Sequence, residues 1–542
     1  MDIRKKRISF DFAACTAIIL FFAFFYFNFS SRRYVSDSLI YAAITEHFRI
    51  DSFWFVNPHH LLYSILGAWV FKLANLLGLA QRAVFCLQFM NSLLGIAGLL
   101  VFYFLAKKIL QDNILALASA SILGCTYGYW YFAVSAEPYA LINFYALVVF
   151  SALYLFLEKP GLKSAILAGV SCALATFFQQ VAVLSLLALC IAFFTARKYK
   201  IKELVHLFSA VIIAILIVGC VYLFFMLFIF KFNDPAEMVR WLLGYGREYF
   251  SFGWDHILKV FYGQYRCLWG GDFIKRLLLG QRDILLVIAA VSFVVSNIIL
   301  LALAVFVPAG LKKAASGRIA FRLIFSWLAV YWLFFSFYAA GEYKFYAVNL
   351  GPLILLAMMG IAGVGSASRS YRPARFLAAG FFVMLFGSNF FGSVIREKNI
   401  ANNEDYRYAM YVRQKARPED LLIFSGVESN AHLYLEYFPQ KKLNVKVLRY
   451  AIRDPDKFRQ EVDSYIRSGR SVYIVPEDRS ISSASIFPSF GKISGCYSPE
   501  SDLVRGFLDK YNYSLVVVDT YKGKGVYAGN RIYKIIKQNN GR

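Results

Sequence analysis

Repeated apolar runs of about 20 residues, separated by short polar segments, constrain this chain more than any other feature of its sequence. The 542 residues are 59% hydrophobic and only 17% charged, and the mean hydropathy is +0.54. A water-soluble chain of this length would carry more charge. The pattern therefore predicts an α-helical polytopic membrane protein.

The formal net charge of +25 has to be read in that context. In a soluble protein so basic a balance would indicate a nucleic-acid partner. Here Lys and Arg are grouped between the apolar runs, which is typical of the positive-inside bias of membrane proteins. The groups are Lys107 and Lys108, residues 197–200, Lys312 and Lys313, and residues 369–375. We therefore expect a lipid bilayer, and no nucleic acid, as the partner of these charges.

The apolar segment at residues 60–80 decides the topology. The first apolar run, residues 12–29, follows a basic lead and lacks a cleavage site, so we expect a retained first span with a cytoplasmic N-terminus. If residues 60–80 formed a second span, the later basic groups would lie outside. Ser64, Ala68, Lys72 and Asn75 share one helical stripe, which favours an interfacial helix. The first outer loop, residues 32–83, then contains that helix.

About eleven transmembrane helices follow from this choice, and the bilayer thickness makes two of them short. They are residues 12–29, 84–106, 114–132, 139–157, 163–178, 181–196, 204–230, 283–307, 319–339, 345–364 and 374–392. Residues 231–282 are expected outside, with their aromatic and basic side chains at headgroup level. The membrane domain is expected to cover residues 1–394.

Residues 395–542 have a different composition, because charge returns and short β-branched runs alternate with helical patterns. The runs are residues 421–424, 445–448, 472–475, 515–518 and 532–536, and the helical patterns are residues 404–415, 456–467 and 499–508. This alternation predicts a small α/β domain. An odd number of spans places this C-terminal domain on the extracytoplasmic side.

The eight cysteines are scattered, mostly inside apolar runs, without CxxC spacing. They are expected to pack as small apolar residues, so the sequence predicts neither a metal site nor a disulfide framework. A bridge between Cys267 and Cys496 is an alternative without further support. No cofactor is predicted, although a divalent metal stays open.

Polar groups that could carry chemistry are expected to meet at the outer membrane face. Asp37 follows the first span, and Glu137 lies in the short loop between the third and fourth spans. The others are His59, His60, Gln179, Glu342 and Lys344. Two carboxylates could divide a glycosyl transfer, one accepting the proton of the attacking hydroxyl and the other orienting it. A lipid-phosphate leaving group would need positive charge, for which Arg247, Arg266 and Lys344 are candidates.

Most of these residues also have an ordinary structural explanation. Asp37 could be a solvated loop residue, and Glu137 could be a charge that favours a helix N-terminus. His59 and His60 are more readily explained as packing or hydrogen-bonding residues than as metal ligands, because no third ligand has suitable spacing. Glu342 and Lys344 could serve as an interfacial anchor.

The order of these motifs resembles the GT-C superfamily of polyprenyl-phosphate-sugar-dependent glycosyltransferases, which includes protein O-mannosyltransferases and aminoarabinose transferases. The motifs are SDS at residues 36–38, NPHHLLY at residues 57–63, SAEPYALIN at residues 135–143 with Tyr139 in an A-E-x-Y pattern, and GEYKFYAVNLGPLILL at residues 341–356. The resemblance extends over the transmembrane region to about Gly392.

The resemblance implies an inverting transfer from a lipid-linked sugar, with Asp37 as general base and a protein or glycolipid acceptor. The chain departs from the protein mannosyltransferases because it lacks an extra lumenal insertion, and it has NPHH where relatives have a proline-rich version. These departures, together with the unassigned C-terminal domain, leave the acceptor open.

Two other functions are compatible with a multispan chain. One is a transporter or lipid flippase, although such proteins place ionisable groups near the bilayer midplane, whereas here the carboxylates lie at span ends. The other is a surface-polysaccharide polymerase or ligase, which usually carries its large catalytic loop late in the chain. With no retention signal in the sequence, we expect a bacterial inner membrane.

Overall fold

The computed structural model describes most of the chain. The described residues are 3–48, 50, 52, 55–79, 82–196, 200–244, 250–251, 253–278, 283–312, 315–368, 370–424, 430–438, 443–448, 454–476, 508, 510–511, 513–523, 527 and 530–537. They form two compact units. The membrane unit comprises Met1–Ser31 and Ile44–Lys398, and the C-terminal unit comprises Arg32–Ala43 and Asn399–Arg542.

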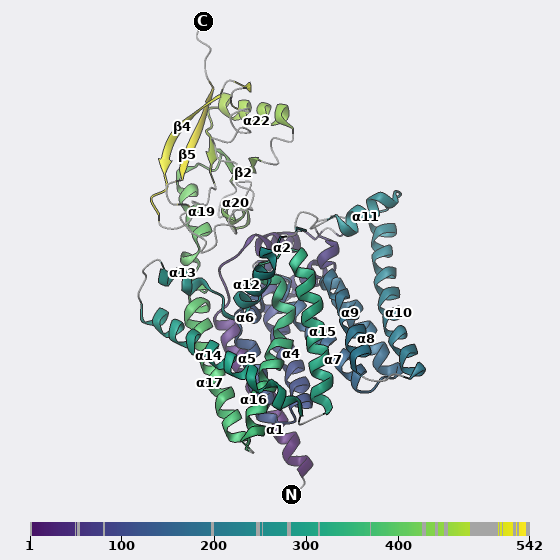
Figure 1. Ribbon diagram of the computed structural model, residues 1–542. Coiled ribbons are helices and arrows are strands. Elements are labelled where there is room, and N and C mark those ends of the chain that lie inside the picture. The colour runs from purple at the N-terminus through teal and green to yellow at the C-terminus, as the bar shows by residue number, and fades with distance from the viewer. Residues whose placement is uncertain are drawn as a thin grey trace. The chain divides into compact units, whose positions relative to one another are not determined.

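The membrane unit is a bundle of apolar helices (Figure 1), and each of the eleven predicted segments contains one. Among the described residues, eight helices are long and apolar enough to cross a membrane, judged by length and composition: Ser9–Asn28, Ala83–Leu110, Tyr139–Glu158, Ile201–Ile229, Ile284–Pro308, Gly317–Phe337, Tyr343–Ser366 and Tyr371–Glu397. Three apolar helices are shorter: Asn113–Cys125, Leu162–Phe178 and Gln180–Thr195. The predicted α-helical membrane architecture is thus confirmed, whereas the number of spans stays a prediction.

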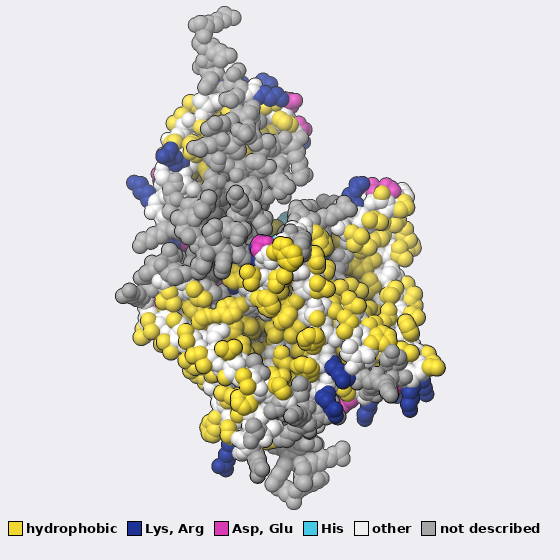
Figure 2. All heavy atoms as spheres, viewed as in Figure 1, with side chains coloured by type: hydrophobic (Ala, Val, Ile, Leu, Met, Phe, Trp, Pro, Cys, Tyr) yellow, Lys and Arg dark blue, Asp and Glu magenta, His cyan; other side chains and the backbone are white. Residues whose placement is uncertain are grey.

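Figure 1 labels these helices, whose full bounds are α1 (Ile3–Asn28), α4 (Ala83–Leu110), α5 (Asn113–Cys125), α7 (Tyr139–Glu158), α8 (Leu162–Phe178), α9 (Leu184–Ala196), α10 (Ile201–Phe224), α14 (Ile284–Lys312), α15 (Ala315–Phe337), α16 (Leu350–Ala367) and α17 (Tyr371–Asn389). Hydrophobic side chains cover the face of the membrane unit in Figure 2. On α10, for example, Ile212, Ile215 and Leu216 are each more than half exposed. Such a surface is stable only against hydrocarbon.

The predicted span at residues 114–132 is not continuous. Helix α5 ends at Cys125, and α6 (Tyr127–Val134) begins after Thr126, whose backbone is extended at φ −64° and ψ 143°. The Thr126 hydroxyl donates to Leu123 O at 2.7 Å, and Asn389 Nδ2 donates to Cys125 O at 2.9 Å. Side chains therefore satisfy carbonyls near the break.

Residues 60–80 contain α3 (Tyr63–Leu76), a helix of 14 residues. At about 1.5 Å per residue it is too short to cross a bilayer core of roughly 30 Å. It is absent from the candidate spans found among the described residues. That it lies in the membrane interface stays a prediction.

The described part of residues 231–282 is more helical and more buried than predicted. They contain α11 (Pro235–Leu243), α12 (Asp255–Trp269) and α13 (Asp272–Leu278). Trp241 is 9% exposed among Tyr222 and Phe230, and Trp269 is 2% exposed and donates to the Ser296 hydroxyl at 3.0 Å. The prediction of a headgroup-level belt is wrong for these two rings, because the protein itself covers them.

The C-terminal unit contains a five-stranded sheet in the order β2-β1-β3-β5-β4. The strands are β1 (Leu421–Phe424), β2 (Asn444–Val447), β3 (Val472–Val475), β4 (Tyr513–Thr520) and β5 (Arg531–Lys537). Strands β2, β1 and β3 run parallel, and β5 is antiparallel to both β3 and β4. All five strands were predicted within a few residues.

Among the described residues after Asn403, the sheet is accompanied by helices α19 (Glu404–Lys415), α20 (Ala431–Tyr437) and α22 (Pro455–Arg467). The patterns at residues 404–415 and 456–467 predicted α19 and α22, whereas α20 was not predicted. The helix expected at residues 499–508 lies outside the described residues except for Leu508, and Cys496 lies outside them too. Phe458 and Val462 of α22 pack with Leu421 and Ile474 into one apolar core.

Candidate functional site

Asp37 is the second residue of α2 (Ser36–Glu46) and is partly exposed. A carboxylate in the first turn of a helix is stabilised by the positive end of the macrodipole. Residues 32–43, which include Asp37, belong to the C-terminal unit. All other site residues that the sequence predicted and the structure describes belong to the membrane unit.

Glu137 is buried, with 3% of its surface exposed, in the link between α6 and α7. An amide on α4 holds this link, because Asn91 Nδ2 donates to Ser135 O at 2.8 Å and to Glu137 O at 2.7 Å. Gln88, one turn earlier on α4, donates to Val134 O at 2.8 Å. The backbone around Glu137 is therefore fixed by side chains of a long neighbouring helix, as a functional site requires.

The carboxylate of Glu137 influences the phenol of Tyr63, the first residue of α3. Burial raises the pKa of Tyr63, and the negative charge of Glu137 raises this pKa further. Asn91 Nδ2 also donates to the Tyr63 hydroxyl at 3.3 Å. A buried acid of this kind fits a functional group better than it fits a charge that only stabilises a helix N-terminus, which was the structural explanation for Glu137.

Aromatic rings connect the predicted residues Tyr139, His60 and Lys344. The Tyr139 ring lies 6.0 Å from the His60 ring and 4.8 Å from the Phe132 ring, measured between centroids. Phe132 stacks on Tyr343 at 5.9 Å with an angle of 13° between the planes. We call this set, His60, Phe132, Tyr139, Tyr343 and Phe345, the aromatic cluster.

His60 is fixed at the edge of this cluster. Its Nδ1 lies 2.7 Å from Phe178 O, and since a carbonyl can only accept, Nδ1 carries the proton. His59 is partly buried, and its backbone N–H donates to Asn57 Oδ1 at 2.9 Å. Across the described residues, no group of three His, Cys, Asp or Glu side chains could hold a metal ion.

Two cations border the aromatic cluster. Lys344 Nζ lies 5.8 Å from the centroid of the Tyr139 ring and 5.7 Å from that of Phe345. Arg266 Cζ, in the last turn of α12, lies 5.0 Å from the centroid of Tyr343. All three distances fall within the range of cation–π attraction. Two positive charges thus lie beside rings of one aromatic cluster, a property expected of a phosphate site.

Helix α12 reaches this position because glycine lets it approach η5 (Tyr343–Asn349). A Cβ added at Gly263 would lie 2.4 Å from Tyr346 Cε2. A larger side chain at this position would force α12 or the Tyr346 ring to shift. Glu342, by contrast, is exposed at the start of η5, and Arg247 lies outside the described residues.

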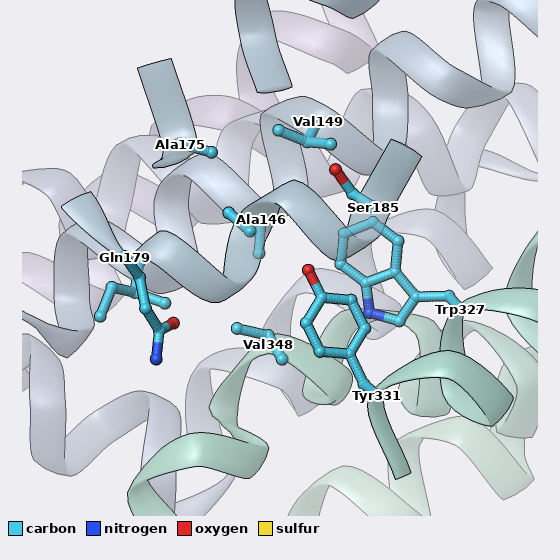
Figure 3. Close-up of a pocket in the computed structure, with 10 residues that line it drawn as sticks. Ala146, Val149, Ala175, Gln179, Ser185, Trp327, Tyr331 and Val348 are labelled. Atoms are coloured by element: carbon cyan, nitrogen blue, oxygen red, sulfur yellow. The ribbon is translucent and has the colours of Figure 1, made fainter. Parts of the chain in front are cut away.

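Gln179 lies in a different place, at a small pocket between α7, α8, α9 and α15 (Figure 3). It is lined by Ile142, Ala146, Val149, Ala175, Gln179, Ala182, Ser185, Trp327, Tyr331 and Val348. Gln179 is 3% exposed, and its Oε1 accepts no hydrogen bond from the part of the chain that the structure describes. The pocket is mostly apolar, so Gln179 supplies one of its few polar groups.

Glu397 is a second buried carboxylate that was not predicted. It is 7% exposed, and its Oε1 accepts a hydrogen bond of 2.8 Å from the Tyr127 hydroxyl. The Tyr127 ring lies 6.0 Å from Tyr343 of the aromatic cluster. In the sequence Glu397 follows the last predicted span in a charged stretch, which gives no sign of burial.

Fold and site together define a polytopic helical membrane protein whose bundle encloses two acids, two cations and a cluster of aromatic rings, joined to a separate α/β unit. No protein-family model and no curated protein matches the chain in sequence.

Solved structures do match it. The chain is similar to ArnT from Cupriavidus metallidurans, at 12% identity over 98% of both chains, with TM-scores of 0.54 for the apo state and 0.51 for the structure bound to undecaprenyl phosphate. Mycobacterial arabinofuranosyltransferase AftD matches at 15% identity over 96% of this chain and 41% of its own, with a TM-score of 0.43. The ArnT structures show that the chain has the ArnT fold, in agreement with the fold that the sequence resemblance implies.

Proposed function

We propose that this protein is a membrane glycosyltransferase that moves a sugar from a polyprenyl-phosphate-linked donor to an acceptor hydroxyl. The observation that carries the proposal is the fold shared along 98% of the chain with ArnT, which one structure presents bound to undecaprenyl phosphate. The acid, cation and aromatic groups of the bundle support it independently, because a sugar phosphate needs all three kinds of contact.

In this proposal Arg266 and Lys344 stabilise the departing lipid phosphate. The leaving group already carries negative charge, so it requires cations rather than an acid. The guanidinium lies 5.0 Å from Tyr343, and the ammonium lies 5.8 Å from Tyr139. Aromatic faces beside them suit the apolar face of a sugar ring and also hold the cations in place.

Asp37 is assigned the role of general base. It accepts the proton of the acceptor hydroxyl while the hydroxyl oxygen bonds to the anomeric carbon and the bond from that carbon to the phosphate oxygen breaks. Polyprenyl phosphate leaves with the bonding electrons. A single displacement of this kind inverts the anomeric configuration. Glu137, whose backbone Asn91 fixes, orients a substrate hydroxyl.

We place the reaction on the extracytoplasmic side of a bacterial inner membrane, with the N-terminus in the cytoplasm and the C-terminal unit outside. Lys107 and Lys108, at the end of α4 opposite Ala83, support this orientation through the positive-inside bias. The acceptor is a hydroxyl of a protein or of a glycolipid, and the sugar is a hexose or a pentose.

The test uses the full chain reconstituted in nanodiscs with synthetic polyprenyl phosphates that carry a hexose or a pentose. We expect protein-dependent release of polyprenyl phosphate, coupled to a labelled sugar on an added membrane acceptor fraction. Donor that stays intact in every combination would overturn the proposal. In liposomes, movement of the intact donor between leaflets without cleavage would instead support the flippase alternative.

A further inference from the structure

The hydroxyl of Tyr434 on α20 binds the backbone of the segment that leads into Asp37. It accepts a hydrogen bond from Tyr34 N at 2.9 Å and donates one to Tyr34 O at 2.9 Å. Both partners belong to the C-terminal unit, although 400 positions separate them in sequence. One side chain thus restrains both polar groups of a single peptide residue.

This contact is buried, and other residues of the unit support it. Tyr434 is 0% exposed and Tyr34 is 3% exposed. Asn403 Nδ2 donates a further hydrogen bond of 2.6 Å to the Tyr434 hydroxyl, which completes its one donor and two acceptor positions. The Tyr34 ring also lies 5.5 Å from the ring of Phe438.

Asn403 is itself locked in place, because its Oδ1 caps α19 by accepting from Asp405 N at 2.9 Å. Asp405 in turn accepts from Asn430 Nδ2 at 2.9 Å, next to the start of α20. The Tyr434 hydroxyl therefore rests on a hydrogen-bonded frame from two helices. Such a supporting frame is what a precise site requires.

Asp37 lies only three residues beyond Tyr34, in the first turn of α2. The last residue of α2, Glu46, is fixed separately, because its Oε1 accepts from Ala83 N at 2.9 Å at the start of α4. The backbone just before α2 is thus held by Tyr434, and the last residue of α2 is held by Ala83 N. Without Tyr434, the turn that carries Asp37 would keep only one of these restraints.

We propose that the C-terminal unit positions the base of the reaction, with Tyr434 as the residue that holds the Asp37 turn through the backbone of Tyr34. This inference rests on the proposed function of Asp37. It gives the part of the C-terminal unit outside residues 32–43 a role in catalysis that does not require its own contact with the substrate.

The test compares Tyr434→Phe with two matched variants in the full chain. Tyr34→Phe removes a hydroxyl but keeps the Tyr34 backbone groups that Tyr434 binds. Tyr511→Phe removes a hydrogen bond of 2.8 Å to Asp456 inside the same unit, away from residues 32–43. We expect kcat to fall about tenfold to a hundredfold in Tyr434→Phe with KM changed less than about threefold, and both matched variants to stay near the unmodified rate.

Hydrogen–deuterium exchange gives a readout that does not depend on activity. We expect the amides of residues 32–43 to exchange about tenfold faster in Tyr434→Phe, while β1 and β3 keep their protection. If β1 and β3 also lost protection, Asn403→Ser would replace this variant, because serine still caps α19 but is too short to reach Tyr434 as the Asn403 amide does. We expect it to show the same change in residues 32–43, in a weaker form.

The two proposals fail in different ways. If the unmodified chain consumes no lipid-linked donor, the proposed function is wrong. If the unmodified chain is active and Asp37→Asn is inactive, but Tyr434→Phe keeps both the kcat and the exchange pattern of the unmodified chain, the positioning role is wrong and the proposed function stands.

Discussion

Tyr127 donates a hydrogen bond of 2.8 Å to Oε1 of Glu397, and this contact joins α6 to the end of the last membrane helix across 270 positions of sequence. Both residues are buried. Hydrogen bonds to buried charged groups are among the stronger ones in proteins, because water cannot take the place of a partner that is lost.

Tyr127→Phe should therefore destabilise the membrane unit by about 1.5–3 kcal/mol. Glu397→Gln should cost less, since the amide oxygen can still accept from Tyr127. Thermal unfolding in detergent, followed at equal protein concentration, measures both changes. An equal or larger loss in Glu397→Gln would show that the charge, rather than this hydrogen bond, stabilises the contact.

Arg266→Ala should lower kcat/KM for the lipid-linked donor by about a hundredfold, because a cation at the departing phosphate is lost. Lys259→Ala on the same helix is the matched control. Lys259 pairs with Asp255 at 2.6 Å, four residues away. Initial rates over a range of donor concentrations give kcat/KM for both variants. Equal losses of kcat/KM in the two would show that Arg266 has no special role at the phosphate.

Gly128 on α6 touches α12, where a Cβ would lie 2.3 Å from Cys267 Sγ. Gly128→Ala should cost about 1–3 kcal/mol of stability through overpacking. It should also reduce transfer, since Cys267 is the neighbour of Arg266. Adding Cys267→Ala should restore part of both losses, although Cys267 O would still lie 3.1 Å from the new Cβ.

Gly219→Ala on α10 is the control for that substitution, because nothing lies within 4 Å of its Cβ position. Alanine favours helix over glycine, so this variant should be neutral or slightly stabilised. The measurement is the melting temperature of Gly128→Ala, of Gly219→Ala and of the double variant Gly128→Ala with Cys267→Ala. A double variant no more stable than Gly128→Ala would show that the thiol is not the clashing group.

The C-terminal unit should show a specific sensitivity to acid at Asp519. The Lys415 ammonium, 2.6 Å away, together with the Thr520 N–H and the Tyr411 hydroxyl, lowers the pKa of Asp519 to about 2. A lowered pKa in the folded state contributes stability above the ordinary value of 3.8, and this stability is lost as pH falls towards 2.

Lys415→Gln should therefore unfold the C-terminal unit at a higher pH than the unmodified chain. Cleavage by pepsin, which works in acid, can follow the transition between pH 5 and pH 2. We expect a difference between the two proteins at pH 5 that disappears near pH 2. A difference that stayed constant across this range would mean that Asp519 does not titrate with folding.

Much of the fold could be predicted because lipid imposes simple patterns on a chain. Helix α4 and helix α10 are long runs without interior charge, and β1 and β3 are short β-branched runs between polar segments. These signals are local. The break at Thr126 was missed because the carbonyl at Cys125 is satisfied by Asn389, which is distant in sequence.

The site was harder to predict for the same reason. The sequence singled out Glu137, Tyr139, His60 and Lys344 by motif, and the structure connects the last three through rings. The sequence could not reveal the burial of Glu397, which depends on Tyr127. Nor could it reveal that residues 32–43 belong to the C-terminal unit, which depends on Tyr434. Contacts between distant positions leave no periodic trace in a single sequence.

The most direct test of the central claim is the rate of sugar transfer from a radiolabelled polyprenyl-phosphate donor by Asp37→Asn at equal expression. The control is Asp234→Asn, since Asp234 caps α11 by accepting from Ala236 N at 2.9 Å and asparagine caps a helix equally well. We predict a loss of at least about a hundredfold for Asp37→Asn and an unchanged rate for the control. Transfer at the unmodified rate by Asp37→Asn would contradict the account.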